Sequence, residues 1–472
     1  MKHAKNTIKL NREQKRKREI LMKSALVFSI VLVLVIAYLM IFVVMDIKYF
    51  DYKEAIKSRE SGEYDKAVSL FENLGEYRDS NEQISETYYQ KAYWHMENEE
   101  YDIAAYLFDY LDDYGDSESR LNWAYYNWAM QLIGKNEFDG AISLFAAAGD
   151  YSDSESQIIE TQYLKAVYLL QNGSPNEALG IFMKITGYKE TQKIVFDYHQ
   201  TLNRNFFSAG RDFTVAVKND GSADIAGQSS TEDINLSNWG DVKNITAGIS
   251  FVAAITSDGR VLAAGNNTHS QLNATEWGNI VQISAGAYHV VGLRTDGTVM
   301  AAGYDQNNQC GVDEWKYIVQ ISAGANHTVA LKSDGTVVAA GEWVQGQCKV
   351  SGWSEIIQVD AGANHTVGLK LDGTVVATGD NTFGQCSTEN WADIVAVSAG
   401  QNYTLGLKSD GTVVYAGDNT FGQCNVENWR DVIAVYAGWY HSLGLKSDGT
   451  LLAVGLNESG QCDANWNDVM MP

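Results

Sequence analysis

An Ala-Gly pair recurs every 38 residues, seven times, along the second half of the chain. An Asp-Gly follows eleven residues after the start of each pair, from Asp220 to Asp448. A strict period of this length predicts a repeat architecture. Asp-Gly between apolar runs predicts a β-hairpin, in which both central residues are expected to have positive φ. We therefore predict a seven-bladed β-propeller over residues 203–472. The pairs begin at Ala209, Ala247, Ala285, Ala323, Ala361, Ala399 and Ala437.

Each 38-residue unit contains three short apolar runs that read as strands. Residues 280–284, 327–332 and 336–340 are examples of the first, second and third run, and all are rich in β-branched residues. Such runs, separated by turn signals, indicate antiparallel blades. The small Ala-Gly pair is expected where strands crowd together, because a larger side chain would clash there.

Residues 25–45 carry no charge and are long enough to cross the hydrocarbon layer as a tilted helix. The preceding residues 1–24 hold nine Lys and Arg against two Glu, a net charge of +7. A cleaved signal peptide would have a shorter apolar stretch and a small-residue cleavage site. We predict a signal-anchor transmembrane helix at 25–45, with a cytoplasmic basic tail at 1–24 and the C-terminal domains extracytoplasmic.

The rest of the chain is strongly acidic. The whole chain carries −24 and residues 1–24 carry +7, so the remainder carries −31. This charge disfavours nucleic acid as a partner and anionic lipid as a docking surface.

Five cysteines occur one per repeat, each after a glutamine, where other repeats have Leu272 or Ile234. We expect them to behave as small hydrophobes rather than to form disulfides or bind metal. An anchored protein without a disulfide framework suggests a bacterium. The cysteines are Cys310, Cys348, Cys386, Cys424 and Cys462.

A second repeat, with a period of 37, fills residues 46–200. Two frames of small residues per period predict two helices per unit and about four units, since small residues let helices approach and nearby aromatics fill the groove. The Asp and Ser of the repeated turns, as in Asp79-Ser80, are expected to cap the following helix. Pro175 fits the first turn of a helix. The frames are Ala67, Ala104, Ala141 and Ala178, each with Phe four residues later, and Ala55, Ala92, Ala129 and Ala166, each with Tyr three residues earlier.

The phrase from Gly62 to Ala67, followed by Phe71, resembles the tetratricopeptide repeat. The resemblance covers about residues 50–195, although the unit is longer and lacks the early Trp and Leu-Gly of that family. It implies an all-α solenoid whose concave face binds peptides or proteins. A rigid stalk that only spaces the propeller from the bilayer is the alternative.

The unit written in full from Ala361 to Gln385 resembles the repeat of the regulator of chromosome condensation family, and the match covers residues 205–470. The short period is similar to the β-lactamase inhibitory protein of the same superfamily, which implies three main strands per blade. The activity of the eponymous nuclear protein on a small GTPase and on chromatin is not expected here, because this chain is acidic and predicted to be exported.

One position of the unit holds His289, His327, His365 and His441, but also Phe213, Phe251 and Tyr403. Four histidines around a ring suggest an axial metal. A position that also accepts phenylalanine is more typical of packing or hydrogen bonding. No paired carboxylates, Ser-His-Asp order, phosphate loop or calcium loop stands outside the repeat frame. We therefore predict no catalytic residue, no cofactor and no metal.

Function is expected where the repeats differ, on loops displayed by a rigid scaffold. Aromatic residues that break the polar consensus are the candidate partner-binding residues. We predict a non-catalytic, membrane-anchored, extracytoplasmic protein-protein interaction scaffold. A propeller that binds or inhibits a secreted enzyme, and a glycan-binding or glycan-acting surface protein, are the alternatives. The candidates are Tyr288, Trp343, Phe383, Phe421, Trp439 and Tyr440.

Overall fold

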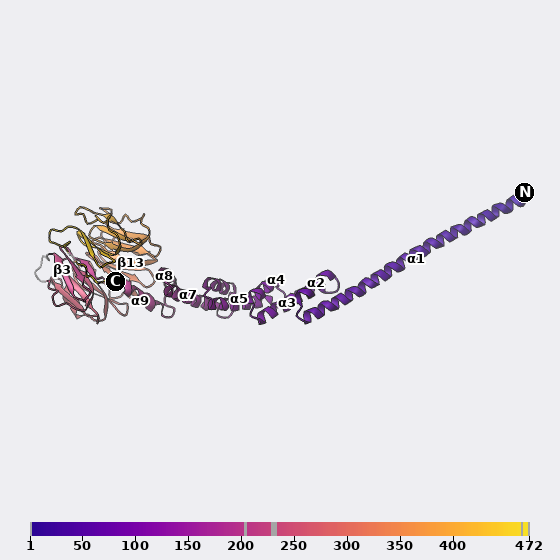
Figure 1. Ribbon diagram of the computed structural model, residues 1–472, viewed down its shortest axis with the longest axis horizontal. Helices are drawn as coiled ribbons and strands as arrows, with labels where there is room; N and C mark the ends of the chain where they lie inside the picture. The colour runs from indigo at the N-terminus through magenta and orange to yellow at the C-terminus, as the bar shows by residue number, and fades with distance from the viewer. Residues whose placement is uncertain (1, 203–204, 228–233, 464–465, 471–472) are drawn as a thin grey trace. The chain divides into compact units, whose positions relative to one another are not determined.

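The computed structural model describes residues 2–202, 205–227, 234–463 and 466–470. Contacts divide the chain into two compact units, Met1–Thr161 and Gln162–Pro472. Helices α1 to α9 come first along the chain and strands β1 to β21 follow (Figure 1). The predicted start of the propeller at residue 203 lies outside the described residues.

The first unit is a series of helix pairs in which long and short helices alternate. On the short helices, Ala67, Ala104 and Ala141 and the phenylalanines four residues later are fully buried. Residues four apart share one helix face, so each short helix buries its Ala and Phe against the long neighbours. Two helices per unit are thus confirmed. The helices are α1 (Lys2–Glu60), α2 (Tyr64–Leu74), α3 (Ser80–Glu97), α4 (Tyr101–Leu111), α5 (Ser117–Gly134), α6 (Phe138–Ala147) and α7 (Ser154–Gln171), which continues into the second unit.

The predicted helix capping by the turn aspartates is wrong. Asp79 makes no side-chain bond to the amides of α3, since its backbone (φ −103°, ψ 26°) is not in the extended conformation that a capping residue adopts. Its carboxylate instead accepts hydrogen bonds from Tyr52 Oη (2.6 Å) and Gln83 Nε2 (3.0 Å). The bond from Tyr52 holds the pKa of Asp79 below its usual value. The same cross-helix bond joins Tyr126 to Asp153 at 2.7 Å.

The second unit contains seven three-stranded antiparallel sheets, each ordered inner, middle, outer strand. The inner strands are β1 (Phe207–Ala209), β4 (Val242–Ala247), β7 (Ile280–Ala285), β10 (Ile318–Ala323), β13 (Ile356–Ala361), β16 (Ile394–Ala399) and β19 (Val432–Ala437). The middle strands are β2 (Phe213–Val217), β5 (Phe251–Thr256), β8 (His289–Arg294), β11 (His327–Lys332), β14 (His365–Lys370), β17 (Tyr403–Lys408) and β20 (His441–Lys446). The outer strands are β3 (Ala223–Gly227), β6 (Val261–Gly265), β9 (Val299–Gly303), β12 (Val337–Gly341), β15 (Val375–Gly379), β18 (Val413–Gly417) and β21 (Leu451–Gly455), and a 3₁₀ helix η1 (Gln271–Glu276) follows β6.

The Asp-Gly hairpins form as predicted, but their expected backbone conformation is wrong. In blade 4 only Gly335 has positive φ (+76°), whereas Asp334 does not. The amide of Gly335 donates to Lys332 O (3.0 Å), and the amide of Lys332 donates to Thr336 O (2.9 Å). This is a three-residue loop that ends in a left-handed glycine, which needs positive φ at one residue only. The Asp334 carboxylate accepts the amide (2.9 Å) and hydroxyl (2.5 Å) hydrogens of Thr336.

The ring closes between blades 7 and 1 through the end of the chain. Val469 is fully buried and forms a β-bridge with Lys218. The amide of Met470 donates to Val217 O (2.9 Å), and Trp466 Nε1 donates to Asp224 Oδ2 (3.2 Å). The segment after the last outer strand therefore pairs with the first blade.

Two helices pack against the hairpin ends of blades 4 and 5. α8 (Pro175–Lys184) begins with the predicted proline, and α9 (Thr191–Leu202) follows it. Phe182 and Met183 share a hydrophobic core with strands of these blades. Gln200 Nε2 of α9 donates to Val319 O at 3.1 Å. Leu371 packs against α8, and the other six hairpins carry a polar residue at its position: Asn219, Ser257, Thr295, Ser333, Ser409 and Ser447.

Candidate functional site

All six candidate residues lie at one end of the blades. Strand pairing places Gly341, the end of an outer strand, opposite His327, the start of a middle strand, and the other blades repeat this register. Tyr288, Trp439 and Tyr440 directly precede middle strands, while Trp343, Phe383 and Phe421 follow outer strands. We call this end the Ala-Gly face, because the Ala-Gly pairs also lie there. The opposite end, with the Asp-Gly turns and helices α8 and α9, is the hairpin face.

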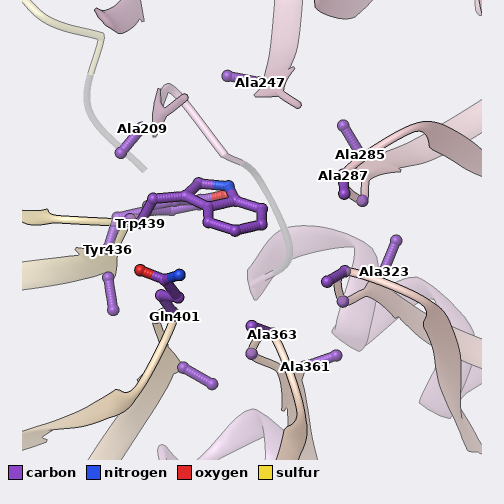
Figure 2. A pocket seen from close by; sticks show the side chains of 18 residues that line it. Ala209, Ala247, Ala285, Ala287, Ala323, Ala361, Ala363, Gln401, Tyr436 and Trp439 are labelled. Carbon is purple, nitrogen blue, oxygen red and sulfur yellow. The ribbon is translucent and has the colours of Figure 1, made fainter. Parts of the chain in front are cut away.

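The Ala-Gly pairs surround an opening on the propeller axis. Figure 2 shows the Trp439 indole extending over the middle of a ring of alanines that includes Ala247, Ala285 and Ala323, with Gln401 beside it. The cavity holds about 50 Å³. A Cβ added to Gly324 would stand 2.4 Å from the carbonyl oxygen of Gly362 on the next blade. The predicted crowding at the pair is therefore confirmed.

A second, polar cavity adjoins this opening, since both are lined by Ala323, Ala361 and Ala399. Its volume is about 100 Å³, and its lining includes Gln282, Ser322, Asp360 and Ser398. The Asp360 carboxylate accepts hydrogen bonds from Ser322 Oγ (2.7 Å), Ser398 Oγ (3.1 Å) and the amide of Ala399 (2.8 Å). Burial raises its pKa, and these bonds oppose the rise. Through these hydrogen bonds the Asp360 carboxylate links blades 4, 5 and 6.

The four motif histidines are buried and link neighbouring blades. His289 Nε2 lies 3.0 Å from Thr328 Oγ1, whose own hydrogen is donated to Gln309 O at 2.7 Å. The histidine must then donate from Nε2, so this nitrogen carries a proton, and the low pKa that follows means that the ring is neutral at pH 7. Burial lowers the pKa of His289 to about 4. The predicted hydrogen-bonding role is confirmed by equivalent pairs His327–Thr366, His365–Thr404 and His441–Thr214.

The other candidate metal ligands and nucleophiles, including the cysteines, also have structural roles. Within the described ranges, no three His, Cys, Asp or Glu side chains are placed to hold a metal ion. The five cysteines are free. Cys348 Sγ donates to Glu342 O at 3.2 Å, and burial raises the pKa of Cys310 to about 12. Such a thiol is protonated at neutral pH and a poor nucleophile.

Aromatic pairs form between a link and the residue directly before the middle strand of the next blade. The rings of Phe421 and Tyr440 have centroids 5.3 Å apart. Tyr288 packs instead against His269 (5.2 Å), which in turn packs against Tyr304 (5.1 Å). Sequence reasoning missed His269 and Tyr304. The signal was present, because the partners in both pairs are separated by 19 residues, half of the repeat.

Trp343 and Phe383 are the most exposed candidates, at 58% and 51%. Val344 beside Trp343 is 80% exposed and was also missed. Carboxylates flank these aromatic residues. Hydrogen bonds from Thr382 hold the pKa of Asp380 below its usual value, so it stays ionised at neutral pH. The Ala-Gly face therefore offers exposed rings among negative charges.

The first unit carries a separate exposed stripe on α4. Ile103, Tyr106 and Tyr110 occupy one side of this helix, and the two tyrosines are 71% and 64% exposed. The Tyr110 ring lies 5.2 Å from that of Tyr88 on α3. The stripe breaks the 37-residue repeat, and comparison of units would have found it. The equivalent residues are Lys66, Ser69 and Asn73, then Gly140, Ser143 and Ala147, then Glu177, Gly180 and Lys184.

In the described part of the chain, one helix is long and apolar enough to cross a membrane. It covers Leu10–Glu60, and the mean hydropathy of its most apolar 18-residue stretch is 3.2. None of that stretch is buried in the protein. A membrane anchor and an N-terminal signal sequence both have these properties.

Comparison with known proteins identifies the repeats. The regulator of chromosome condensation (RCC1) repeat model matches residues 242–271, 280–311, 318–347, 356–385, 394–423 and 432–461. The chain thus carries six repeats of this family, and the predicted fold class, a helical region followed by a seven-bladed propeller, is confirmed. No curated protein sequence matches the chain.

Several solved structures resemble the chain. The ectodomain of the Arabidopsis thaliana receptor kinase ACR4 has 20% identity and a TM-score of 0.48, and the match covers 57% of this chain and 99% of that one. Yeast RCC1 (Prp20) bound to Kap60 has 17% identity and a TM-score of 0.45, covering 58% and 85%. Prp20p from Saccharomyces cerevisiae, described with its binding to Gsp1p and histones, has 17% identity and a TM-score of 0.45, covering 58% and 87%.

Proposed function

We propose that this propeller of RCC1 repeats is the binding domain of a non-catalytic, membrane-anchored scaffold, and that its Ala-Gly face binds protein partners. One observation carries the proposal: aromatic residues that break the repeat gather on this face, whereas α8 and α9 cover part of the hairpin face. Exposed aromatic residues are enriched among the residues that dominate binding energy. Propellers of this repeat family mostly bind or regulate.

The anchor is residues 25–45, with residues 1–24 cytoplasmic and residues 46–200 and 203–472 on the other side of the membrane. The apolar run and its basic flank support this topology. The cysteine usage supports a bacterial origin. The exposed apolar and aromatic side chains of the α4 stripe support a binding role for the helical repeats in addition to spacing.

The chemistry of the Ala-Gly face suits a partner with both apolar and cationic side chains. Exposed rings such as Trp343 attract Lys or Arg through their faces. Nearby carboxylates, such as Asp380 and Asp418, add charge complementarity and exclude acidic partners. A secreted enzyme with a basic surface, captured or inhibited by the propeller, is one such partner.

Simultaneous substitution of Trp343, Trp439 and Tyr440 by alanine is expected to reduce partner capture at least tenfold, because each truncation of a dominant contact costs about 2 kcal/mol or more. The measurement is quantitative affinity capture from cell-surface extract, with the full chain as bait. Tyr317→Ala with Tyr415→Ala is the matched control, since these exposed aromatics lie away from the Ala-Gly face.

Capture that is undiminished by the triple variant would contradict the binding face. Loss of activity of a captured enzyme would identify the partner as an inhibited enzyme. Binding of glycans but no protein, lost in the same variant, would contradict protein as the ligand and favour the glycan alternative.

A further inference from the structure

The predicted membrane segment and the first helical repeat are parts of one helix. α1 runs unbroken from Lys2 to Glu60 (Figure 1), and its last residues, including Tyr52 and Ala55, pack against Phe71 of α2. At 1.5 Å per residue, Tyr52 lies only about 10 Å beyond Met45, the end of the apolar run. The first repeat therefore begins within the headgroup region if residues 25–45 span the bilayer.

The turn between α2 and α3 folds back onto this part of α1. The side chain of Tyr77 from the turn and the side of α1 border a shallow, open groove of about 350 Å³. Lys48 Nζ lies 5.9 Å from the centre of the Tyr77 ring. Most of the lining is apolar and belongs to the end of the membrane segment. The α1 residues that line the groove are Met40, Ile41, Val44, Met45 and Lys48.

Cations and tyrosines cluster directly above the groove. The Arg78 Cζ atom lies 5.1 Å from the centre of the Tyr49 ring, 5.2 Å from that of Tyr52 and 5.4 Å from that of Tyr77. Arg78 has positive φ (55°), and the next repeat has glycine at this position. The fourth unit repeats the arrangement, with Lys189 Nζ 5.0 Å from the centre of the Tyr163 ring and 5.4 Å from that of Tyr188. What distinguishes Arg78 is therefore its place beside the apolar run and not its side chain. Phe50 is also exposed on α1.

We propose that the α2–α3 turn and residues 40–50 of α1 form a phospholipid-binding site at the outer edge of the hydrocarbon layer. This rests on the proposed membrane span. An acyl chain occupies the groove beside Tyr77, and the phosphate lies near Arg78 and Lys48. Tyrosines at headgroup level and cations that reach up to the interface have this role in membrane proteins.

The headgroup is zwitterionic rather than anionic. The cations Lys48, Lys53 and Arg78 lie in the same segments as four carboxylates, so these segments carry no net positive charge. The carboxylates are Asp46, Asp51, Glu76 and Asp79. The site then adds no net attraction for anionic lipid, so binding depends on the groove and the aromatic rings. Its consequence is that the first repeat is seated on the bilayer rather than held away by a linker.

The test measures bilayer depth with nitroxide labels on the full chain in phosphatidylcholine bilayers. Tyr77→Cys carries the label at the site, and Tyr114→Cys carries it at the same turn position one repeat later. Leu34→Cys reports on the span itself. Unsubstituted protein, treated identically, provides the background of the native cysteines. The readout is the ratio of collisions with oxygen to collisions with a water-soluble nickel chelate.

We expect a ratio several-fold higher at residue 77 than at residue 114, and higher still at residue 34. Equal ratios at 77 and 114, with residue 34 in the hydrocarbon, would overturn the lipid site and leave the anchor intact. An aqueous signal at residue 34 would overturn both. Phe50→Cys, at an exposed position on α1, is expected to show the same interfacial signal and decides the question if Tyr77→Cys does not fold.

Discussion

Between pH 6.5 and pH 4 the free energy of unfolding of the propeller is expected to fall steeply. Burial lowers the pKa of His289, His365 and His441 to about 4 and that of His327 to about 3, whereas an unfolded histidine titrates near 6.5. In this interval the unfolded chain binds more protons than the folded one, so stability decreases as pH decreases. The stabilising contribution is complete above pH 6.5 and is lost as pH falls towards the folded pKa.

The effect is large because the histidines act together. Each titrating histidine adds about 1.4 kcal/mol per pH unit to the slope, so four of them lower the free energy of unfolding by up to about 11 kcal/mol over two units, which is comparable to the stability of an ordinary domain. Buried His199 on α9, whose pKa is lowered to about 4, adds to the slope. Urea unfolding at pH values from 7 to 4 measures how the free energy of unfolding depends on pH.

His289→Phe is expected to reduce the slope by about one proton, since Phe213 and Phe251 occupy the same position in other blades. His269→Phe is the control, because His269 lies half-buried on the Ala-Gly face rather than between blades. A flat profile between pH 6.5 and 5, or a slope unchanged by His289→Phe, would show that the buried histidines do not govern acid stability.

Gly324→Ala is expected to destabilise the ring by about 3 kcal/mol or more. The new Cβ would lie 2.4 Å from the carbonyl oxygen of Gly362 and 2.4 Å from His327 Cε1. Because one of these atoms is backbone of the next blade, relief requires two blades to separate. Separation also strains the bond from His327 to Thr366.

Gly278→Ala is the matched control for that substitution. No atom lies within 4 Å of a Cβ at residue 278, and its φ is not in the positive range. We expect a change of at most about 0.5 kcal/mol. The comparison uses denaturant unfolding at pH 7. Equal losses at both positions would argue that the Ala-Gly pair serves the turn alone and not the packing of blades.

The sequence alone was sufficient to predict the structural elements that recur in every blade. Each Ala-Gly and Asp-Gly pair recurs at the same place in seven blades, so a wrong prediction for one repeat is corrected by comparison with the other six. The turn conformation and the capping were mispredicted because both depend on one backbone angle: Asp334 has no positive φ, and Asp79 is not extended. Residue type alone does not determine those angles.

Contacts between distant segments were not predictable from the period. The pairing of Met470 with Val217 closes the ring, and nothing in either residue type indicates it. Leu371 gave a usable signal, since it is apolar where other hairpins are polar, and it marks where α8 packs. In the candidate site, Phe421 and Tyr440 were predicted separately, while their contact follows from the half-period spacing.

The central claim is that the Ala-Gly face is where partners bind. Site-specific photo-crosslinking in intact cells tests it most directly, with a benzophenone amino acid placed at Phe421 or Phe383 on this face, or at Tyr317 on the hairpin face. We predict that both Ala-Gly positions crosslink to the same polypeptide and that Tyr317 does not. Crosslinks from Tyr317 alone, or equal crosslinking from both faces, would contradict the claim.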